Sequence, residues 1–293
     1  MGEWEIASDG LRARENGEWA KRKLEFLDQF GPPALDATEK KRRRVYIDLF
    51  AGPGLNLAHT TGGGEFESGA LRMLTMRGSG EARPAFTDAY LVNLDRDDQQ
   101  ALTERVDRLD HATRLALPRG AIRLLEGDAN QLIPSILSAC NRMDYLFVFA
   151  DPENPSQWPW RSVEALVAGG HESMDLYLLL PLEMGIRRLL NFKGGPHQAD
   201  RLTEFFGTDA WEPIVGERVT PAQSQRLIQA LEDLYLRRLG RYWSHVNEVL
   251  SVHRVGNQGL YRMIFASNHD AGLNIARWAK RKAEGGDQGN LFG

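Results

Sequence analysis

One stretch of the sequence, Val45 to Asn56, constrains the fold more than any other. Residues 45–50 are apolar or β-branched except for Asp48, which is typical of a short strand buried on both faces. The run ends in Ala-Gly-Pro-Gly, where small residues permit a tight turn. In a doubly wound sheet, ligands bind at the carboxyl ends of the strands. A glycine loop at this place therefore lets the backbone approach a cofactor closely.

The glycine spacing differs from the dinucleotide fingerprint G-x-G-x-x-G, because no third glycine follows Gly54 at the required position. With its acid inside the strand, the stretch Asp48 to Gly54 resembles motif I of class I S-adenosylmethionine-dependent methyltransferases. The resemblance implies that Asp48 orients the amino-acid end of the cofactor. It also implies cofactor contacts from the loop, made by Phe50, Ala51, Gly52 and Gly54. The alternative is an ordinary strand-turn-helix whose glycines serve only the turn.

Composition narrows the class of protein but not its partners. The 293 residues can form one elaborated α/β domain, or one domain with a small appendage. The net charge of −4 favours no class of partner. We expect a cytoplasmic protein without membrane contact, because there is no signal-peptide pattern and no apolar run of roughly 20 residues. The single cysteine, Cys140, excludes an internal disulfide and a cysteine-based metal cluster, and we predict no metal site.

Residues 1–43 are expected to form an N-terminal helical segment, with a helix over 17–38 followed by the basic run 40–44. This run is either a phosphate-binding patch or a solvated cap at the entry edge of the first strand. We favour the cap, because the ligand crevice lies at the other end of that strand. A polar segment over 59–64 follows the glycine loop, and it can close over a ligand.

The pattern then alternates strands and helices, which predicts a cofactor-binding core over residues 44–184. The further core strands are expected at 88–94, 121–125, 144–150 and 174–180. Residues 185–241 are mainly helical and basic, and we expect this insert to form a lid or to recognise the substrate. Residues 242–284 supply a hairpin and a last helix that complete the core, and 285–293 form a tail.

Acidic residues follow the second and third strands. Asp95 lies about 40 residues after the glycine loop, where a carboxylate can accept hydrogen bonds from both hydroxyls of a ribose. It can also cap the helix that begins near residue 97, and both roles are compatible. In the methyltransferase pattern, an acid after the third strand accepts the adenine amino group, which points to Asp128 with Ala129 beside it. Asp128 can instead act only as a helix cap.

The fourth strand ends in Asp151-Pro152-Glu153-Asn154. This resembles motif IV of amino-directed methyltransferases, D-P-P-Y or N-P-P-Y, which holds a planar amine in line with the methyl group. The resemblance assigns the acceptor site to Asp151 and Pro152, and Glu153 can act as a general base for a less acidic nucleophile. Because Asn154 replaces the aromatic residue of the motif, a stacking platform would have to come from Trp158 or Trp160.

Four segments together resemble the three-Cys-motif partner proteins, over roughly Trp19 to Lys282. They are Lys23-Leu24-x-Phe26-Leu27, the stretch Arg44 to Gly54, the strand into Asp151-Pro152, and Leu260-Tyr261-x-Met263-Ile264-Phe265-Ala266-Ser267. That family is methyltransferase-like and is named for its genomic association with a cysteine-rich, radical-type S-adenosylmethionine protein. The resemblance implies S-adenosylmethionine as cofactor and a partner of that kind. It also implies a Rossmann-like class I methyltransferase fold, a seven-stranded mostly parallel α/β sheet with a C-terminal antiparallel hairpin and a helical insert.

We therefore expect an S-adenosylmethionine-dependent methyltransferase that acts on an N or O nucleophile, with nucleic acid as the favoured acceptor. One alternative is a cofactor-binding but catalytically silent partner of a radical S-adenosylmethionine-type protein. Another is a nicotinamide or other nucleotide enzyme, because one fold supports many functions. The missing third glycine argues against this last alternative.

Overall fold

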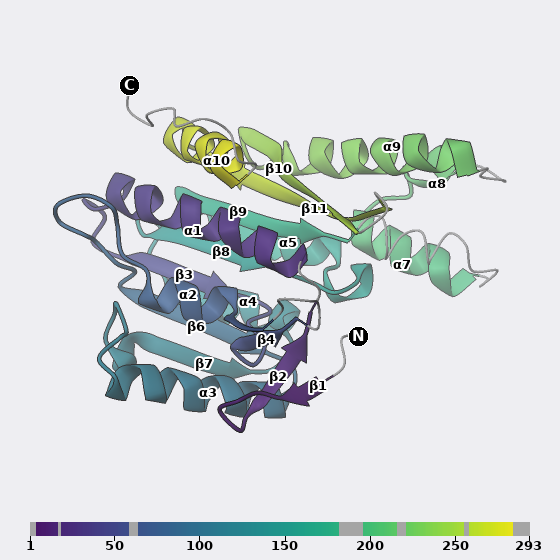
Figure 1. Ribbon diagram of the computed structural model, residues 1–293. Coiled ribbons are helices and arrows are strands. Elements are labelled where there is room, and N and C mark those ends of the chain that lie inside the picture. Colours follow the sequence, from purple (N-terminus) through teal and green to yellow (C-terminus); the bar gives the residue numbers. More distant parts are fainter. Residues whose placement is uncertain are drawn as a thin grey trace.

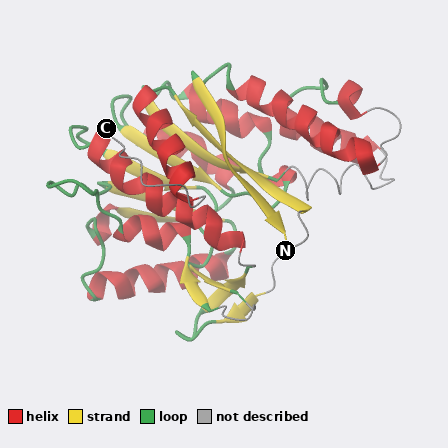
Figure 2. Cartoon of the chain, turned by 45° about the horizontal axis from the view of Figure 1, so that its top comes forward, coloured by secondary structure: helices red, strands yellow, loops and turns green. Residues whose placement is uncertain are grey.

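The computed structural model describes residues 4–16, 19–58, 64–181, 196–215, 221–254 and 258–283. Within these ranges, helices cover both faces of a seven-stranded sheet, and a small four-stranded sheet lies beside it (Figures 1 and 2). The described residues include no helix that is long and apolar enough to cross a bilayer. Several expectations fall outside these ranges. They concern residues 59–63 of the polar segment, the end of the core and the start of the basic insert over 182–195, residues 216–220 of the insert, and the tail.

The large sheet confirms the predicted fold class. Its strands lie in the order β10-β11-β9-β8-β3-β6-β7. The five from β9 to β7 are parallel, while β11 runs antiparallel to both β9 and β10. The bounds are β3 Arg44–Asp48, β6 Asp88–Asn93, β7 Ile122–Glu126, β8 Tyr145–Ala150, β9 Ser173–Leu180, β10 His245–Arg254 and β11 Gln258–Ser267. The chain order reverses between β3 and β8, so the crevice where this fold binds ligands lies at the ends of these two strands.

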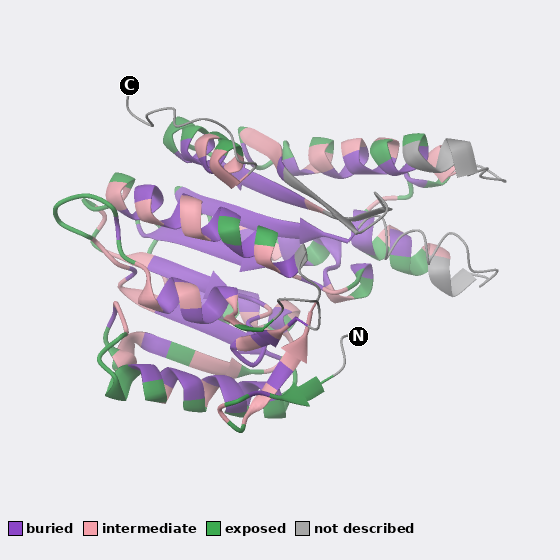
Figure 3. Ribbon diagram, in the orientation of Figure 1, coloured by how far each residue is buried: buried purple, intermediate pink, exposed green. Residues whose placement is uncertain are grey.

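Two hydrophobic layers hold the helices against the sheet (Figure 3). Every residue of β8 and β9 is buried, which is why their sequences are nearly continuous apolar runs. One face carries α1 Trp19–Ala37, α2 Gly69–Thr75, α3 Arg96–His111 and α10 Asp270–Ala283. The other carries α4 Ala129–Ser138, α5 Trp160–Ala168, α7 Pro196–Phe206 and α9 Pro221–Leu239. Three short helical turns, η1 Arg119–Ala121, η2 Pro155–Gln157 and α8 Glu212–Val215, join these elements.

The small sheet was not predicted. It has the order β1-β2-β4-β5, with β1 Trp4–Ile6, β2 Arg12–Glu15, β4 Leu55–Leu57 and β5 Glu65–Glu67. The strands are only three or four residues long. Apolar and polar residues alternate within β1, β4 and β5, but an alternation with at most two apolar positions does not identify a strand. Because β2 pairs in parallel with β4, directly after the glycine loop, the N-terminal hairpin lies beside that loop.

The basic run at the entry of β3 is used inside the protein. Arg43 binds Asp88 at 3.0 Å and Asp144 at 2.9 Å, and Arg44 donates to backbone carbonyls. Lys41 donates to the Ser173 hydroxyl at 2.8 Å. These contacts fasten the entry edge of the sheet, and they favour the cap over a phosphate-binding patch.

Candidate functional site

Four predicted acids lie at one edge of the sheet. Asp48 is the last residue of β3, and Asp151 directly follows β8, its neighbour. Asp95 and Asp128 each lie two residues beyond the ends of β6 and β7. Because these four strands are parallel, their carboxyl ends bring the four acids to the same side. The glycine loop 51–54 leaves β3 at this edge.

A polar cavity lies between the glycine loop, α1 and β2. It is lined by Arg14, Asn16, Lys23, Leu24, Asp48, Phe50, Ala51, Gly52, Pro53, Asn56, Ser68, Gly69, Phe149 and Asp151. Its volume of about 30 Å³ has room for roughly two water molecules. A ligand of nucleoside size needs a pocket of several hundred cubic ångströms. Side chains at this site must therefore move before such a ligand can enter.

Asp48 is a buried acid held by two hydrogen bonds. Its side chain accepts from the Tyr46 hydroxyl at 2.8 Å and from the Phe50 N–H at 3.1 Å. Burial raises the pKa of Asp48 to about 7, although both hydrogen bonds and the charge of Lys23 act to lower it. The carboxyl group therefore exchanges its proton near neutral pH and can accept a hydrogen bond from an ammonium group.

Asp151 forms a close ion pair with Lys23 of α1. The two side chains are only 15% and 11% exposed, so water weakens the pair little. Lys23 was not among the predicted site residues. A signal was present, because Lys23 lies with Ala20, Leu24 and Leu27 on the buried stripe of the helix, where a charged residue needs a partner.

The two glycines of the loop have different surroundings. Gly52 has φ +65°, and a Cβ atom there would have no neighbour within 4 Å among the described atoms. Gly54 has φ +100°, and its Cβ would meet the side chains of Arg105, Leu102 and Leu71 at 3.1–3.2 Å. Gly52 thus leaves open space at the site, while Gly54 allows close packing against α2 and α3. Gly54 is not among the residues that line the cavity.

Asn93 clamps the glycine loop to the end of β6. Its side-chain oxygen accepts from the Gly52 N–H at 2.7 Å, and its amide group donates to the Gly52 carbonyl at 3.0 Å and to Gln99 at 2.9 Å. Asn93 was not among the predicted site residues. The available signal was a polar residue directly after the apolar run of residues 89–92.

Asp95 and Asp128 both cap helices, as their alternative interpretation proposed. Asp95 Oδ1 accepts from the N–H groups of Asp97 and Asp98 at the start of α3, at 2.9 and 3.1 Å. Asp128 Oδ1 accepts from the Asn130 N–H at 2.9 Å, and the buried Ala129 begins α4. Their roles toward ribose and adenine remain predictions.

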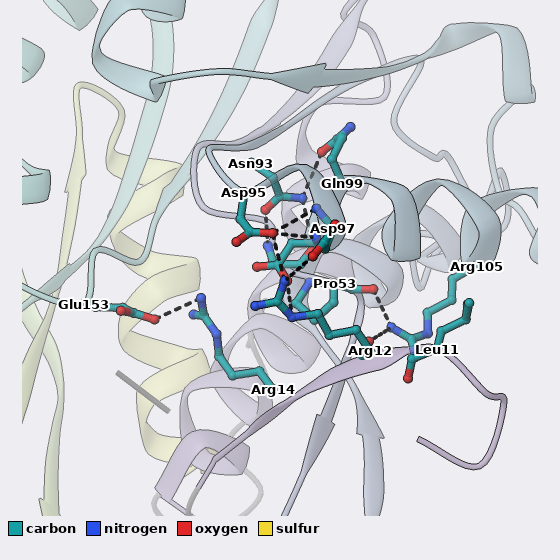
Figure 4. A network of polar contacts seen from close by, with 12 residues as sticks. Leu11, Arg12, Arg14, Pro53, Asn93, Asp95, Asp97, Gln99, Arg105 and Glu153 are labelled. Carbon is teal, nitrogen blue, oxygen red and sulfur yellow. Dashed lines mark hydrogen bonds and ion pairs between the residues drawn. The ribbon is translucent and has the colours of Figure 1, made fainter. Parts of the chain in front are cut away.

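Arginines of β2 bind two of the predicted site residues (Figure 4). Arg12 lies 3.0 Å from Asp95, and Arg14 lies 2.9 Å from Glu153. Glu153 can act as a base only after Arg14 releases it, because the ion pair occupies the carboxylate. The buried Pro152 separates Glu153 from Asp151 and restricts the backbone between them.

The hypothesis that Trp158 or Trp160 stacks on an acceptor is wrong in this structure. Both side chains are fully buried. Trp158 donates its indole N–H to the Tyr235 hydroxyl at 3.1 Å, and Trp160 packs edge-on against the same tyrosine. They therefore join β8 to the helical layer of α9. The aromatic side chains that line the cavity are those of Phe50 and Phe149.

Comparisons with known proteins support the fold. A Legionella pneumophila protein of the DUF519 family is similar over 91% of this chain and 92% of its own, with a TM-score of 0.50 and 8% identity. Spermidine synthase from Thermotoga maritima covers 91% of this chain with 65% of its own length, at a TM-score of 0.41 and 11% identity. A SAM-dependent methyltransferase from Aquifex aeolicus is similar over 87% of this chain and 100% of its own, with a TM-score of 0.34 and 15% identity. No family model and no curated protein matches the sequence. At these identities the likeness concerns the fold alone.

Proposed function

We propose that the protein is an S-adenosylmethionine-dependent methyltransferase that acts on an N or O nucleophile, with nucleic acid as the favoured acceptor. One observation carries the proposal. The open loop at Gly52 and the carboxylates of Asp48 and Asp151 meet at one polar cavity, at the point where the strand order reverses. A cofactor held by the loop at Gly52 and by Asp48 would lie beside Asp151.

The residues at the amino-acid end fit such a cofactor. Gly52 permits a close backbone approach, and Asp48 can accept from an α-ammonium group. Two lining atoms, Ser68 Oγ and Arg14 Nε, are buried and make no hydrogen bond to the described residues. Both are donors, which suits an α-carboxylate. Asp95 and Asp128 would serve the ribose and the adenine. When bound, S-adenosylmethionine supplies an electrophilic methyl group.

The protein's own part in the reaction is to position the acceptor. Lys23 and the buried Pro152 hold the Asp151 carboxylate in place at the end of β8. If the acceptor is an amine, Asp151 accepts its hydrogen bond and orients its lone pair. If the acceptor is a hydroxyl, a proton must leave as the methyl group arrives, and Glu153 can take it once Arg14 has turned away.

Basic side chains on the helical insert support a polyanionic acceptor. Arg201 of α7 and Arg226 and Arg237 of α9 are exposed. Replacing these three residues by Gln should weaken the binding of a nucleic-acid acceptor. It should also reduce the dependence of the affinity on salt, because binding releases about one counterion fewer for each phosphate contact that is lost. An unchanged salt dependence would favour a peptide or small-molecule acceptor.

A second candidate function is a cofactor-binding, catalytically silent partner of a cysteine-rich, radical-type protein. The observation that favours it is that basic side chains form ion pairs with the carboxylates of the site. Arg12, Arg14 and Lys23 bind Asp95, Glu153 and Asp151, and the remaining cavity is small. The membership in the three-Cys-motif partner proteins, on which this partner rests, is likewise a proposal.

Two measurements separate these functions. Calorimetric titration with S-adenosylmethionine, S-adenosylhomocysteine and NAD identifies the cofactor class. Transfer of a labelled methyl group to fractionated nucleic acid, peptide and metabolite pools then identifies the acceptor, with Asp151→Ala, Asp151→Asn and Glu153→Gln as variants. The exposed Glu164→Gln on α5 is the control. Binding without labelling of any pool, even with the partner protein added, would favour the silent partner.

For an amine acceptor, Asp151→Asn should retain part of the activity and Asp151→Ala should lose most of it. For a hydroxyl acceptor, Glu153→Gln should be the more damaging change. Unaltered transfer in all three variants would refute the assignment of the acceptor site to this loop.

A further inference from the structure

Two arginines of β2 reach both sides of the candidate site (Figure 4). They are two positions apart in the strand, so their side chains leave the same face. Arg12 Nη1 lies 3.0 Å from Asp95 Oδ1 and 3.3 Å from Asp97 Oδ2, at the start of α3. Arg14 Nη2 lies 2.9 Å from Glu153 Oε1, in the loop after β8. β2 therefore bridges the position predicted for the ribose and the position predicted for the acceptor.

The backbone of β2 is firmly attached to the rest of the protein. β2 pairs with both β1 and β4. The side chain of Arg105, which is 4% exposed, donates to the carbonyls of Arg12 at 2.7 Å and Pro53 at 2.6 Å, and to the carboxylate of Asp9. Moving β2 away would leave this buried guanidinium with the Pro53 carbonyl and without its acceptors in the hairpin. The long side chain of Arg12 can move at much lower cost.

Arg12 forms an ion pair with Asp95, the acid that is predicted to bind a ribose. The carboxylate of Asp95 is oriented by its capping bonds to α3, and its side chain is 48% exposed. A ribose diol binds such a carboxylate by donating its hydroxyl hydrogens. Arg12 and both capping N–H groups meet the carboxylate at Oδ1, so a diol that uses both oxygens of Asp95 competes with the guanidinium at Oδ1.

Arg12 keeps other partners if it leaves Asp95. Its Nε lies 3.5 Å from Oδ1 of the buried Asp98, and neither atom makes a hydrogen bond to the described residues. The exposed carboxylate of Asp97 is also within reach. On the other side, the Trp4 ring lies 3.6 Å from the guanidinium and steadies the observed position.

We infer that Arg12 is a gate of the nucleoside subsite: its guanidinium closes Asp95 in the free protein, and it shifts toward Asp97 and Asp98 when an adenosyl cofactor binds. The inference rests on the proposed function, because it assumes that the cofactor carries a ribose. It assigns to the N-terminal hairpin a control over cofactor affinity.

The test is calorimetric titration of S-adenosylhomocysteine into wild type, Arg12→Met and Arg119→Met, at low and moderate salt. Methionine keeps much of the apolar stem and removes the charge. Arg12→Met should bind about fivefold more tightly, because a partly exposed ion pair no longer has to be broken. Arg119→Met is the matched control: it removes the guanidinium that binds Asp107 of α3 at 2.6 Å, ahead of β7 and away from the residues that line the cavity, and its affinity should equal that of wild type.

Salt supplies a second readout that needs no variant. S-adenosylhomocysteine carries no net charge at neutral pH, whereas the Arg12–Asp95 pair is weakened by screening. The affinity of wild type should therefore rise with salt, and that of Arg12→Met should not.

Two results would overturn the gate: equal or weaker binding by a cooperatively folded Arg12→Met, or a wild-type affinity independent of salt. If Arg12→Met does not fold, the salt dependence of wild type decides alone. Failure of wild type and both variants to bind S-adenosylhomocysteine would instead refute the proposed function.

Discussion

Replacing Asp48 by Asn should change how the stability of the protein depends on pH. The Asp48 side chain is 1% exposed, and its burial raises the pKa from the ordinary 3.8 to about 7. Between these two pH values the carboxyl group holds a proton when the protein is folded and loses it on unfolding. The stability that Asp48 contributes is therefore fully present below about pH 4 and is lost as the pH rises through about 7.

The magnitude follows from the two pKa values. Each pH unit between them changes the free energy of unfolding by about 1.4 kcal/mol, which gives about 4 kcal/mol in all. About 2.5 kcal/mol of this change falls between pH 5 and pH 8. An amide does not ionise in this range. The free energy of unfolding of Asp48→Asn, minus that of wild type, should therefore rise by about 2.5 kcal/mol from pH 5 to pH 8.

The difference in the free energy of unfolding at about pH 5 measures a different effect. There the carboxyl is protonated in the folded protein, so the comparison is between a carboxylic acid and an amide. Each has one carbonyl oxygen, which can accept from the Phe50 N–H, and one donor group, which can face the oxygen of the Tyr46 hydroxyl. The stability of Asp48→Asn should therefore lie within about 1 kcal/mol of that of wild type at this pH.

The assay is urea unfolding followed by tryptophan fluorescence and circular dichroism. Asp175→Asn is the matched control, since Asp175 is also buried and its burial raises its pKa to about 6. The free energy of unfolding of Asp175→Asn, minus that of wild type, should rise by only about 1.4 kcal/mol from pH 5 to pH 8. Asp175 lies near the start of β9, away from the glycine loop, so only Asp48→Asn should weaken the binding of S-adenosylhomocysteine. A difference for Asp48→Asn that stays constant within about 0.5 kcal/mol over this range would refute the reasoning.

Four further tests concern the site and its surroundings. Lys23→Gln and Asp151→Asn, combined in a double-mutant cycle by urea unfolding, should show a coupling of about 2 kcal/mol, and additive effects would contradict a tight ion pair. Gly52→Val should abolish the calorimetric binding of S-adenosylhomocysteine while unfolding stays cooperative. Retained binding in Gly52→Val would count against the loop as a ligand contact. Gly54→Ala should lower the stability by about 2 kcal/mol, because its Cβ would meet three side chains at 3.1–3.2 Å. Tyr235→Phe should destabilise by about 1–2 kcal/mol, since a buried indole N–H loses its acceptor, and a lowered affinity would show that this aromatic cluster reaches the site.

Sequence patterns were sufficient for the large sheet. Its strands were predicted to within a few residues, because a strand buried on both faces requires an unbroken apolar run. The terminal hairpin and the mainly helical character of residues 185–241 were also predicted, and the described part of this insert contains α7 and α9. Strands of three or four residues are too short for their alternation to be distinguished from chance. This is why β1, β2, β4 and β5 were missed, although β4 directly follows the glycine loop.

Within the site, the sequence by itself determined that Asp48, Gly52 and Asp151 lie together. Parallel strands of one sheet end at one edge, so the position of a residue along the chain decides its place. The same logic brought Asp95 and Asp128 to that edge. It did not show that both cap helices, because a cap and a ligand contact use the same carboxylate.

Only the tertiary structure decided which charges meet. Lys23 lies 128 residues from Asp151, and Arg12 lies 83 residues from Asp95. Ion pairs between such distant segments leave no periodic signal in a single sequence, since their geometry depends on how α1 and the small sheet pack against the large one. The same packing buries Trp158 and Trp160 against α9 instead of leaving them at the site. The edge of the sheet thus follows from local patterns, and the cations that cover it follow from the packing of separate elements.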